Sequence, residues 1–170
     1  MIIRDEIPAD IDAIEALTVA AFERTAHTSR TEHLIVDALR RAGQLSVSLV
    51  VEGDGGRIVG HVACSPVALS GGETGWYGLG PISVLPERQR QGIGTQLMRR
   101  ALAALRDAGA AGCVLAGNPK LYNRFGFAPR EGLIYPGVPP EYFLALSFDG
   151  RWPRGTVRYH EAFEVTARRP

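Results

Sequence analysis

The part of this chain best suited to hold a charged ligand is residues 82–95, with the sequence I-S-V-L-P-E-R-Q-R-Q-G-I-G-T. It leads from an apolar, strand-like segment into a turn with two glycines and then into the start of a helix. Because Gly92 and Gly94 have no Cβ, a ligand can come within hydrogen-bonding distance of the main-chain amides. The helix N-terminus adds N–H groups without a helical partner and a partial positive charge. The segment therefore predicts an anion-binding site, with the polar side chains of residues 89–91 at its rim.

Two better-known phosphate-binding loops do not fit this turn. A P-loop needs a lysine directly after its last glycine, whereas Lys120 is the only lysine in the chain. A dinucleotide-binding fingerprint needs a third small residue three positions after the second glycine, and Leu97 stands there instead. Neither nucleotide-binding motif is therefore predicted.

The turn instead matches the pattern Q/R-x-x-G-x-G/A, which runs here from Gln89 to Gly94 after an apolar strand and Pro86. By this pattern the segment resembles the GNAT superfamily of N-acetyltransferases, in which the turn holds the pyrophosphate of acetyl-CoA. A glycine turn ahead of a helix also occurs as a plain connection between elements. A second match elsewhere in the chain is needed to separate the two interpretations.

That second match lies at residues 111–127, A-G-C-V-L-A-G-N-P-K-L-Y-N-R-F-G-F. A short apolar strand is followed by Asn118 and Pro119, which end the strand and begin a helix. The order resembles the acetyltransferase segment in which a strand splays from its neighbour, an Asn contacts the pantetheine arm and a Tyr faces the thioester. By this resemblance Asn118 and Tyr122 contact the cofactor. From the residues alone, Asn118 is a helix cap and Tyr122 packs against neighbouring phenylalanines.

The strand before the turn is expected to complete the cofactor site. In the family, main-chain groups of this strand pair with the amides of the pantetheine arm as an added strand would. The resemblance therefore implies the following cofactor-binding residues: Ile82, Ser83, Val84, Gln89, Arg90, Gln91, Gly92, Ile93, Gly94, Thr95, Asn118 and Tyr122.

The order of the predicted elements is also that of the family, which implies an α+β, layered α/β architecture, the GNAT fold. In this fold a central, mostly antiparallel mixed sheet is flanked by helices, and a splayed pair of strands holds acetyl-CoA. We expect helices at 8–22 and 31–41, a helix from Gly94 to Gly109 and a short one after Asn118, with strands at 2–4, 45–51, 57–69, 76–84, 113–116, 141–148 and 156–159.

Two local expectations accompany this order of elements. Thr31 is expected to cap the second helix, which Gly43 ends. The strands at 141–148 and 156–159 flank the turn Asp149-Gly150 and are expected to form a terminal pair. The tail that holds them is expected to complete the sheet or to cover the acceptor cleft.

Acetyl transfer from a thioester to an amine needs a proton acceptor, a donor to the oxyanion and a proton donor for the thiolate. Tyr122 is the predicted general acid, because a phenol with an unperturbed pKa of about 10 is protonated at neutral pH. The resemblance implies a main-chain N–H near Val84 as the oxyanion donor. The base stays open among four side chains: His61, Glu73, Tyr77 and His160.

The predicted function is therefore acetyl-CoA-dependent N-acetylation of an amine on a small molecule or peptide, by direct attack. The segments 23–30 and 135–140 are expected to shape the acceptor site, but their sequences do not select an acceptor. The alternative is a non-catalytic acyl-CoA-binding or regulatory module, which would keep the glycine turn and have no need of Tyr122.

Composition sets the wider limits of the prediction. At 170 residues and 45% hydrophobic content, we expect one domain over residues 1–170, with a core of about 1–147 and a C-terminal extension at 148–170. The net charge of +1 gives no reason to expect a nucleic-acid partner. Two isolated cysteines predict reduced thiols and no metal site, and the absence of a signal-like or membrane-spanning segment predicts a cytoplasmic protein. A monomer and a homodimer are both compatible with the sequence.

Overall fold

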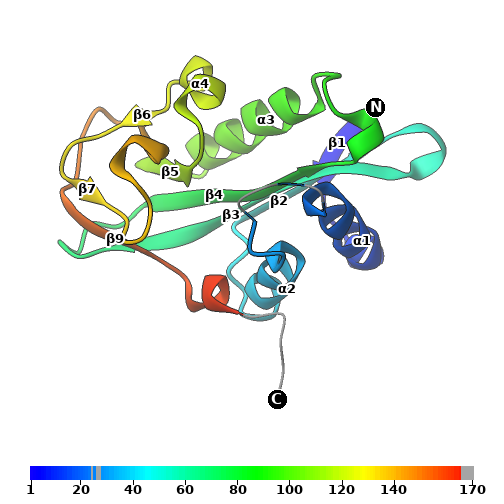
Figure 1. Cartoon of the computed structure of the whole chain (residues 1–170), viewed down its shortest axis with the longest axis horizontal. Coiled ribbons are helices and arrows are strands. Elements are labelled where there is room, and N and C mark those ends of the chain that lie inside the picture. The colour runs from blue at the N-terminus through cyan, green and yellow to red at the C-terminus, as the bar shows by residue number, and fades with distance from the viewer. Residues whose placement is uncertain (24, 26–27, 166–170) are drawn as a thin grey trace.

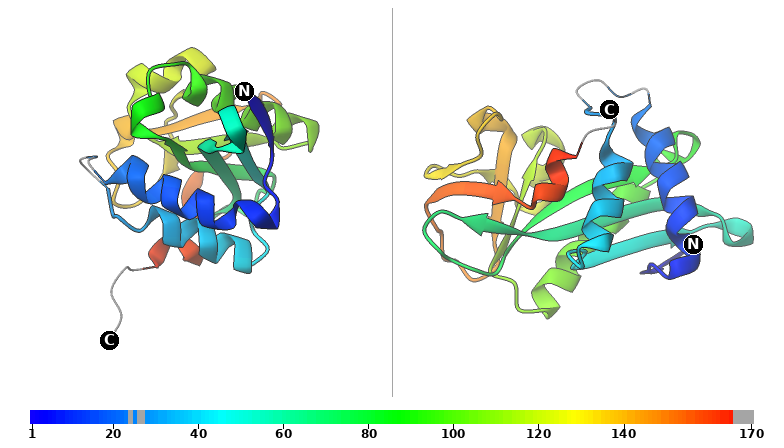
Figure 2. Two further views of the ribbon diagram at one scale, coloured as in Figure 1. Left: turned by 90° about the vertical axis from the view of Figure 1, so that its right-hand side faces the viewer. Right: turned by 90° about the horizontal axis from the view of Figure 1, so that it is seen from below.

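The fold was obtained as a computed structural model that describes residues 1–23, 25 and 28–165. A twisted sheet lies between two helical layers (Figures 1 and 2). On one face lie α1 (Ile11–Phe22) and α2 (Glu32–Arg41), and on the other lie α3 (Ile93–Asp107) and the short α4 (Pro119–Tyr122). The predicted α+β architecture, a mixed sheet flanked by helices, is confirmed.

The strands of the sheet follow the order β1-β2-β3-β4-β5-β8-β6, with β9 attached to β3 and β7 attached to β9. Their neighbours run antiparallel, apart from the parallel pairs β4/β5 and β7/β9. The bounds are β1 Ile2–Asp5, β2 Val47–Glu52, β3 Ile58–Leu69, β4 Trp76–Val84, β5 Gly112–Ala116, β6 Ala128–Pro129, β7 Leu133–Ile134, β8 Phe143–Ser147 and β9 Gly155–Tyr159.

Strands β4 and β5 run together for only three residue pairs. Trp76 to Gly78 pair with Gly112 to Val114, and β4 then continues to Val84 without its neighbour. The predicted splayed pair is thus present at the middle of the sheet. The remaining half of β4 leads directly into the glycine turn.

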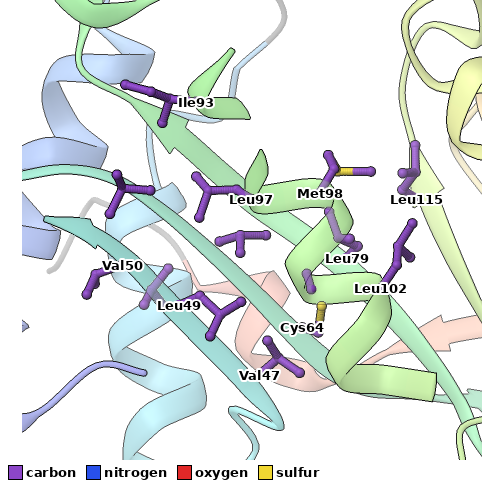
Figure 3. Close-up of a cluster of buried hydrophobic side chains, with 14 of the residues drawn as sticks. Val47, Leu49, Val50, Cys64, Leu79, Ile93, Leu97, Met98, Leu102 and Leu115 are labelled. Carbon is purple, nitrogen blue, oxygen red and sulfur yellow. The ribbon is translucent and has the colours of Figure 1, made fainter. Parts of the chain in front are cut away.

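Helix α3 is held against the sheet by an apolar face, which places the glycine turn at the end of β4 (Figure 3). Leu97 is fully buried, and Cys64 and Leu79 lie in the same cluster below the helix. Close packing needs a glycine in β3, because a Cβ on Gly60 would lie 3.0 Å from Ile93 Cγ2 and 3.1 Å from Leu97 Cδ1. The first two turns of α3 are therefore fixed above β3.

The predicted ends of the helices are partly confirmed. Gly43 and Gly109 follow α2 and α3 with φ of +69° and +82°, as expected of C-terminal glycines. The prediction that the side chain of Thr31 caps α2 is wrong. Its hydroxyl instead lies 2.6 Å from Ser29 Oγ, so it is hydrogen-bonded to the loop before the helix and not to the helix N-terminus. The first turn predicted from Pro8 is a 3-10 turn ahead of α1.

The prediction of a terminal strand pair is also wrong, although both strands exist. Strand β8 pairs with β5, and β9 pairs with residues 67–69 of β3. The reason is that β3 has 12 residues and β2 only 6, so β3 extends past the end of its partner and offers a free edge. The expectation that the tail completes the sheet is confirmed for β9; its last residues, 166–170, lie outside the described residues.

In the described parts of the chain, no helix is both long enough and apolar enough to cross a membrane.

We expect Leu97→Ala to lower the free energy of unfolding by about 2–5 kcal/mol, because the leucine is fully buried under α3 and the change leaves a cavity. Urea unfolding measures this loss. The neighbouring Gln96→Ala removes an exposed side chain from the same helix and should change stability by about 0.5 kcal/mol or less. Equal losses for the two variants would contradict this account of how α3 is anchored.

Candidate functional site

A cleft of about 530 Å³ opens where β4 leaves β5. Its walls come from the end of α1 on one face of the sheet, and from the glycine turn, α3 and α4 on the other. Nine of the twelve cofactor residues predicted from the sequence line it: Ile82, Val84, Gln89, Arg90, Gly92, Ile93, Gly94, Thr95 and Tyr122. The fold thus gathers two segments that lie some thirty residues apart in the sequence.

Three predicted residues do not line the cleft. Ser83 is buried and stands opposite His61 in the β3/β4 ladder. Gln91 is exposed, and its Oε1 accepts a hydrogen bond of 3.0 Å from Arg88 Nε. Asn118 caps α4, since its Oδ1 accepts from the Lys120 N–H at 2.9 Å. The capping interpretation of Asn118 is confirmed.

The glycine turn has the conformation that its sequence suggests. Gly92 has φ +84°, a left-handed value that other residues adopt only with strain. A Cβ on Gly92 would meet nothing within 4 Å, so the space above it is open to a ligand. Arg90 has φ +65° in spite of its side chain, and such strain is typical of binding sites. Gln89 ties the turn to β4, because its Nε2 donates to the Val84 carbonyl at 3.2 Å.

The cleft is positively charged. Arg88, Arg90 and Arg124 line it, and no acidic side chain of the described residues does. Arg124 Nη2 donates to Thr95 Oγ1 at 2.7 Å, and its guanidinium lies 4.8 Å from the ring centre of Phe125. These contacts fix one cation beside the first turn of α3. The lining therefore favours a ligand with several negative charges.

Sequence reasoning missed Arg88 and Arg124 as residues of the cleft. Each lies inside or next to one of the two matched segments, which was the only available signal. It also missed the contribution of α1, whose Ala21 and Phe22 reach the cleft from the opposite face of the sheet. Such contacts depend on packing between layers and leave no local pattern.

Tyr122 lies in the cleft on α4, and burial raises the pKa of its phenol above the usual value. The hydroxyl therefore keeps its proton at neutral pH. The ring sits close against the end of β5, where a Cβ on Gly117 would come within 2.6 Å of Tyr122 Cε2. The missing side chain at Gly117 thus allows this position of the ring.

None of the four side chains left open as the base lines the cleft. Glu73 is exposed, while Tyr77 and His160 are half-buried, and His160 Nδ1 accepts from the Ala162 N–H at 3.0 Å. His61 is fully buried, with Nε2 at 2.8 Å from Ser48 Oγ. Among the residues that the structure describes, no three His, Cys, Asp or Glu side chains gather as a metal site would need.

The cleft, the turn and the splayed strands together define an acetyltransferase of the GNAT type. Residues 3–130 match the family model described as "Acetyltransferase (GNAT) domain", and the chain belongs to this family. It is 37% identical over 169 residues to the uncharacterized N-acetyltransferase YhbS of Escherichia coli K12, covering 96% of this chain and 98% of that protein.

Two solved structures resemble the fold along nearly its whole length. A GNAT family acetyltransferase from Brucella melitensis in complex with acetyl-CoA is 49% identical with a TM-score of 0.85, covering 95% of this chain and 97% of that one. YhbS from Escherichia coli in complex with CoA is 34% identical with a TM-score of 0.86, covering 96% and 92%.

His61 makes the stability of the fold depend on pH. Burial is the main cause that lowers the pKa of its imidazole from 6.5 to about 4, with Arg40 acting in the same direction and Glu6 against it. Below pH 6.5 the imidazole of His61 therefore becomes protonated in the unfolded chain, whereas in the folded protein it stays neutral until about pH 4. The free energy of unfolding should fall across this window by an amount on the order of 3 kcal/mol.

Urea unfolding between pH 7 and pH 4 measures this effect, with His61→Gln as the variant without the titrating ring. Its stability should fall less steeply than that of the wild type. The carboxylates that also lose stability in acid, such as Glu6 with its lowered pKa, are present in both proteins. Parallel curves for the two proteins would show that His61 does not carry the effect.

Proposed function

We propose that this protein uses acetyl-CoA to acetylate an amine on a small molecule or peptide by direct attack, with Tyr122 as the general acid. The observation that carries the proposal is the cleft itself, which places the glycine turn, the free half of β4 and Tyr122 around one space. The relatives whose structures were solved in complex with acetyl-CoA and CoA share this fold over nearly the whole chain, which supports acetyl-CoA as the cosubstrate.

The cleft fits coenzyme A in both charge and shape. The pyrophosphate would lie at the amides of residues 92–95, beside the guanidinium groups of Arg90 and Arg124. The pantetheine arm would follow β4, where main-chain groups of residues 82–84 can pair with its amides. The side chains of Ser83 and Gln91 lie outside the cleft, so these two residues would contact the cofactor through their backbone. Asn118 would contact it from its position directly ahead of α4.

The chemistry follows from the thioester, which supplies an activated acetyl group. The amine nitrogen forms a bond to the carbonyl carbon, the carbon–sulfur bond breaks, the amine loses a proton and the thiolate gains one. Tyr122 is suited to the last step, since burial keeps its phenol protonated and α4 holds the ring at the cleft. The phenolate then regains its proton from water. A main-chain N–H near Val84 would donate to the developing oxyanion.

A non-catalytic acyl-CoA-binding module would need the same turn and strand. It would have no use for a phenol at the cleft, whereas here the missing side chain of Gly117 leaves room for the Tyr122 ring, so the position of Tyr122 favours the enzyme.

We also propose a single domain over residues 1–170 in the cytoplasm, where the buried free thiols of Cys64 and Cys113 would stay reduced.

Replacing Gly92 by leucine should strongly weaken acetyl-CoA binding. The new side chain would fill the open space above the turn, in addition to a backbone cost of about 1–2 kcal/mol from the left-handed conformation. We expect the thermal shift with acetyl-CoA to disappear and the Kd from calorimetry to rise about tenfold or more, which is about 1.4 kcal/mol.

Gly109→Leu is the matched control. Gly109 has φ +82° and equally open space around it, but it lies at the far end of α3. This variant should lose the same stability and keep its full response to acetyl-CoA. A response lost in both variants, or in neither, would contradict the placement of the cofactor at the turn.

Tyr122→Phe should lower kcat by about 100-fold or more, because the departing thiolate loses its proton donor. The thermal shift with acetyl-CoA should persist, since the ring and its packing remain. Free-thiol release over a panel of small amines, amino acids and short peptides measures the rate. Tyr142→Phe, at an exposed tyrosine outside the cleft, is the control and should leave the rate unchanged. A Tyr122→Phe enzyme with full kcat would rule out the general-acid role.

A further inference from the structure

Three polar side chains of β3 and β4 each carry a buried atom without a hydrogen-bond partner within the described structure. The unpaired atoms are His61 Nδ1, Ser65 Oγ and Ser83 Oγ. The residues alternate with apolar positions so that all three side chains lie on the face covered by α1 and α2, away from α3. Buried polar atoms are normally paired, because an unpaired one costs about 1–3 kcal/mol. Three such atoms on one face of the sheet point to a role other than stabilising the fold.

The hydrogen bonds behind His61 determine which of its nitrogens carries the proton. Glu6 is a carboxylate that Arg40 holds with two bonds, at 2.7 and 2.9 Å, and its pKa is lowered, so it can only accept. Ser48 has a single proton and donates it to Glu6 Oε1. The oxygen of Ser48 therefore accepts from His61 Nε2–H at 2.8 Å. Nδ1 is left as a bare acceptor with a fixed direction.

Ser83 stands opposite His61 in the sheet and lies between two residues of the cleft in the sequence. It pairs with His61 across the β3/β4 ladder, and side chains of such partners have Cβ atoms about 4.5–5.5 Å apart. Its two neighbours in the strand, Ile82 and Val84, both line the cleft. The cleft also receives Phe22 from α1, on the same face of the sheet as His61. The side chains of Ile82 and Val84 point to the other face of the strand, so the Ser83 hydroxyl belongs to the strand that borders the cleft and lies on the same face of the sheet as the free nitrogen.

We propose that Ser83 and His61 form the route by which the acceptor amine loses its proton, a proposal that rests on the acetyltransferase function. Ser83 Oγ and His61 Nδ1 are not hydrogen-bonded to each other in the structure, so a rotation of the Ser83 side chain must first bring them together. As the carbon–nitrogen bond forms, the amine proton passes to Ser83 Oγ, and the hydroxyl proton of Ser83 passes to His61 Nδ1. The resulting imidazolium is paired through Ser48 with the Glu6 carboxylate. When the product leaves, the proton returns by the same path to water in the open cleft. His61 is a positioning residue here, because it acts through Ser83.

The electrostatics suit a group that holds a proton only briefly. The charged groups that act on the ring are Glu6, from the segment after β1, and Arg40 from α2, while β2 and β4 present the hydroxyls of Ser48 and Ser83. Burial keeps the imidazole neutral at physiological pH, so its lone pair is available before each turnover. Glu6 favours the imidazolium, which makes the transfer possible without exposing the ring to water.

His61→Gln tests the relay, because the glutamine amide can still donate to Ser48 but has no acceptor in place of Nδ1. With the best acceptor from a panel of small amines, amino acids and short peptides, we expect kcat to fall by about 100-fold. The KM for acetyl-CoA and the thermal shift with acetyl-CoA should stay within about twofold of wild type. The deficit should persist as the pH rises through the pKa of the amine, because the relay removes the proton that a neutral amine must still lose as the carbon–nitrogen bond forms.

Ser83→Ala should show the same loss of kcat, which keeps the test open if the glutamine variant folds poorly. Ser65→Ala is the matched control, since it removes an equally buried and unpaired hydroxyl from the same face, opposite Gly78. Its rate should equal that of the wild type. A His61→Gln or Ser83→Ala enzyme with full kcat would overturn the relay while leaving the acetyltransferase function intact.

The tautomer gives a test that does not depend on turnover. Nitrogen-15 NMR of the wild-type protein should show the His61 ring protonated at Nε2 and bare at Nδ1. A proton on Nδ1 would overturn the proposal. If the wild type shows neither a thermal shift with acetyl-CoA nor thiol release with any amine, the proposed function itself fails and the relay fails with it.

Discussion

The site depends on the early end of the backbone ladder between β4 and β5. Over the first three residue pairs the strands are held together, and beyond Gly78 the free half of β4 has no partner on that side. A register shift on the other side of β4 contributes to this, because Gly80 and Pro81 of β4 stand opposite the single residue Ala63 of β3. Such a bulge bends a strand, and Pro81 within it has no N–H to offer to a neighbour. The cleft is the space left by these two strands.

The glycine turn is held in place by the core beneath it. Arg90 and Gly92 adopt left-handed conformations that a free loop would avoid. They persist because α3 begins immediately afterwards and is packed onto β3 at Gly60, where no larger residue fits. The helix thereby determines where the amides of its first turn point. Leu97 thus supports the wall of the cleft from within the core without lining the cleft itself.

Local patterns predicted the parts of the fold that local forces determine. The bounds of β4, the end of α3 at Gly109 and the Asn118 cap follow from alternation, a C-terminal glycine and a side-chain oxygen next to free N–H groups. The partner of β9 could not be predicted, because it depends on β3 extending past β2, and strand pairing is non-local. The same holds for Arg88 and Arg124, which converge only when β4, α3 and α4 assemble.

The two faces of the sheet differ in a way that bears on function. Below α3 the side chains of β3 and β4 are apolar and closely packed, which gives the turn a rigid support. Toward α2, the same strands carry His61 and Ser83, and the ion pair of Glu6 and Arg40 lies behind them. Apolar residues of similar size would pack there without unpaired atoms, so these polar groups reduce the stability of the fold. These polar groups lower the stability of the fold and lie behind β4, the strand that borders the cleft. The proposed proton route through Ser83 and His61 explains their presence there better than packing does.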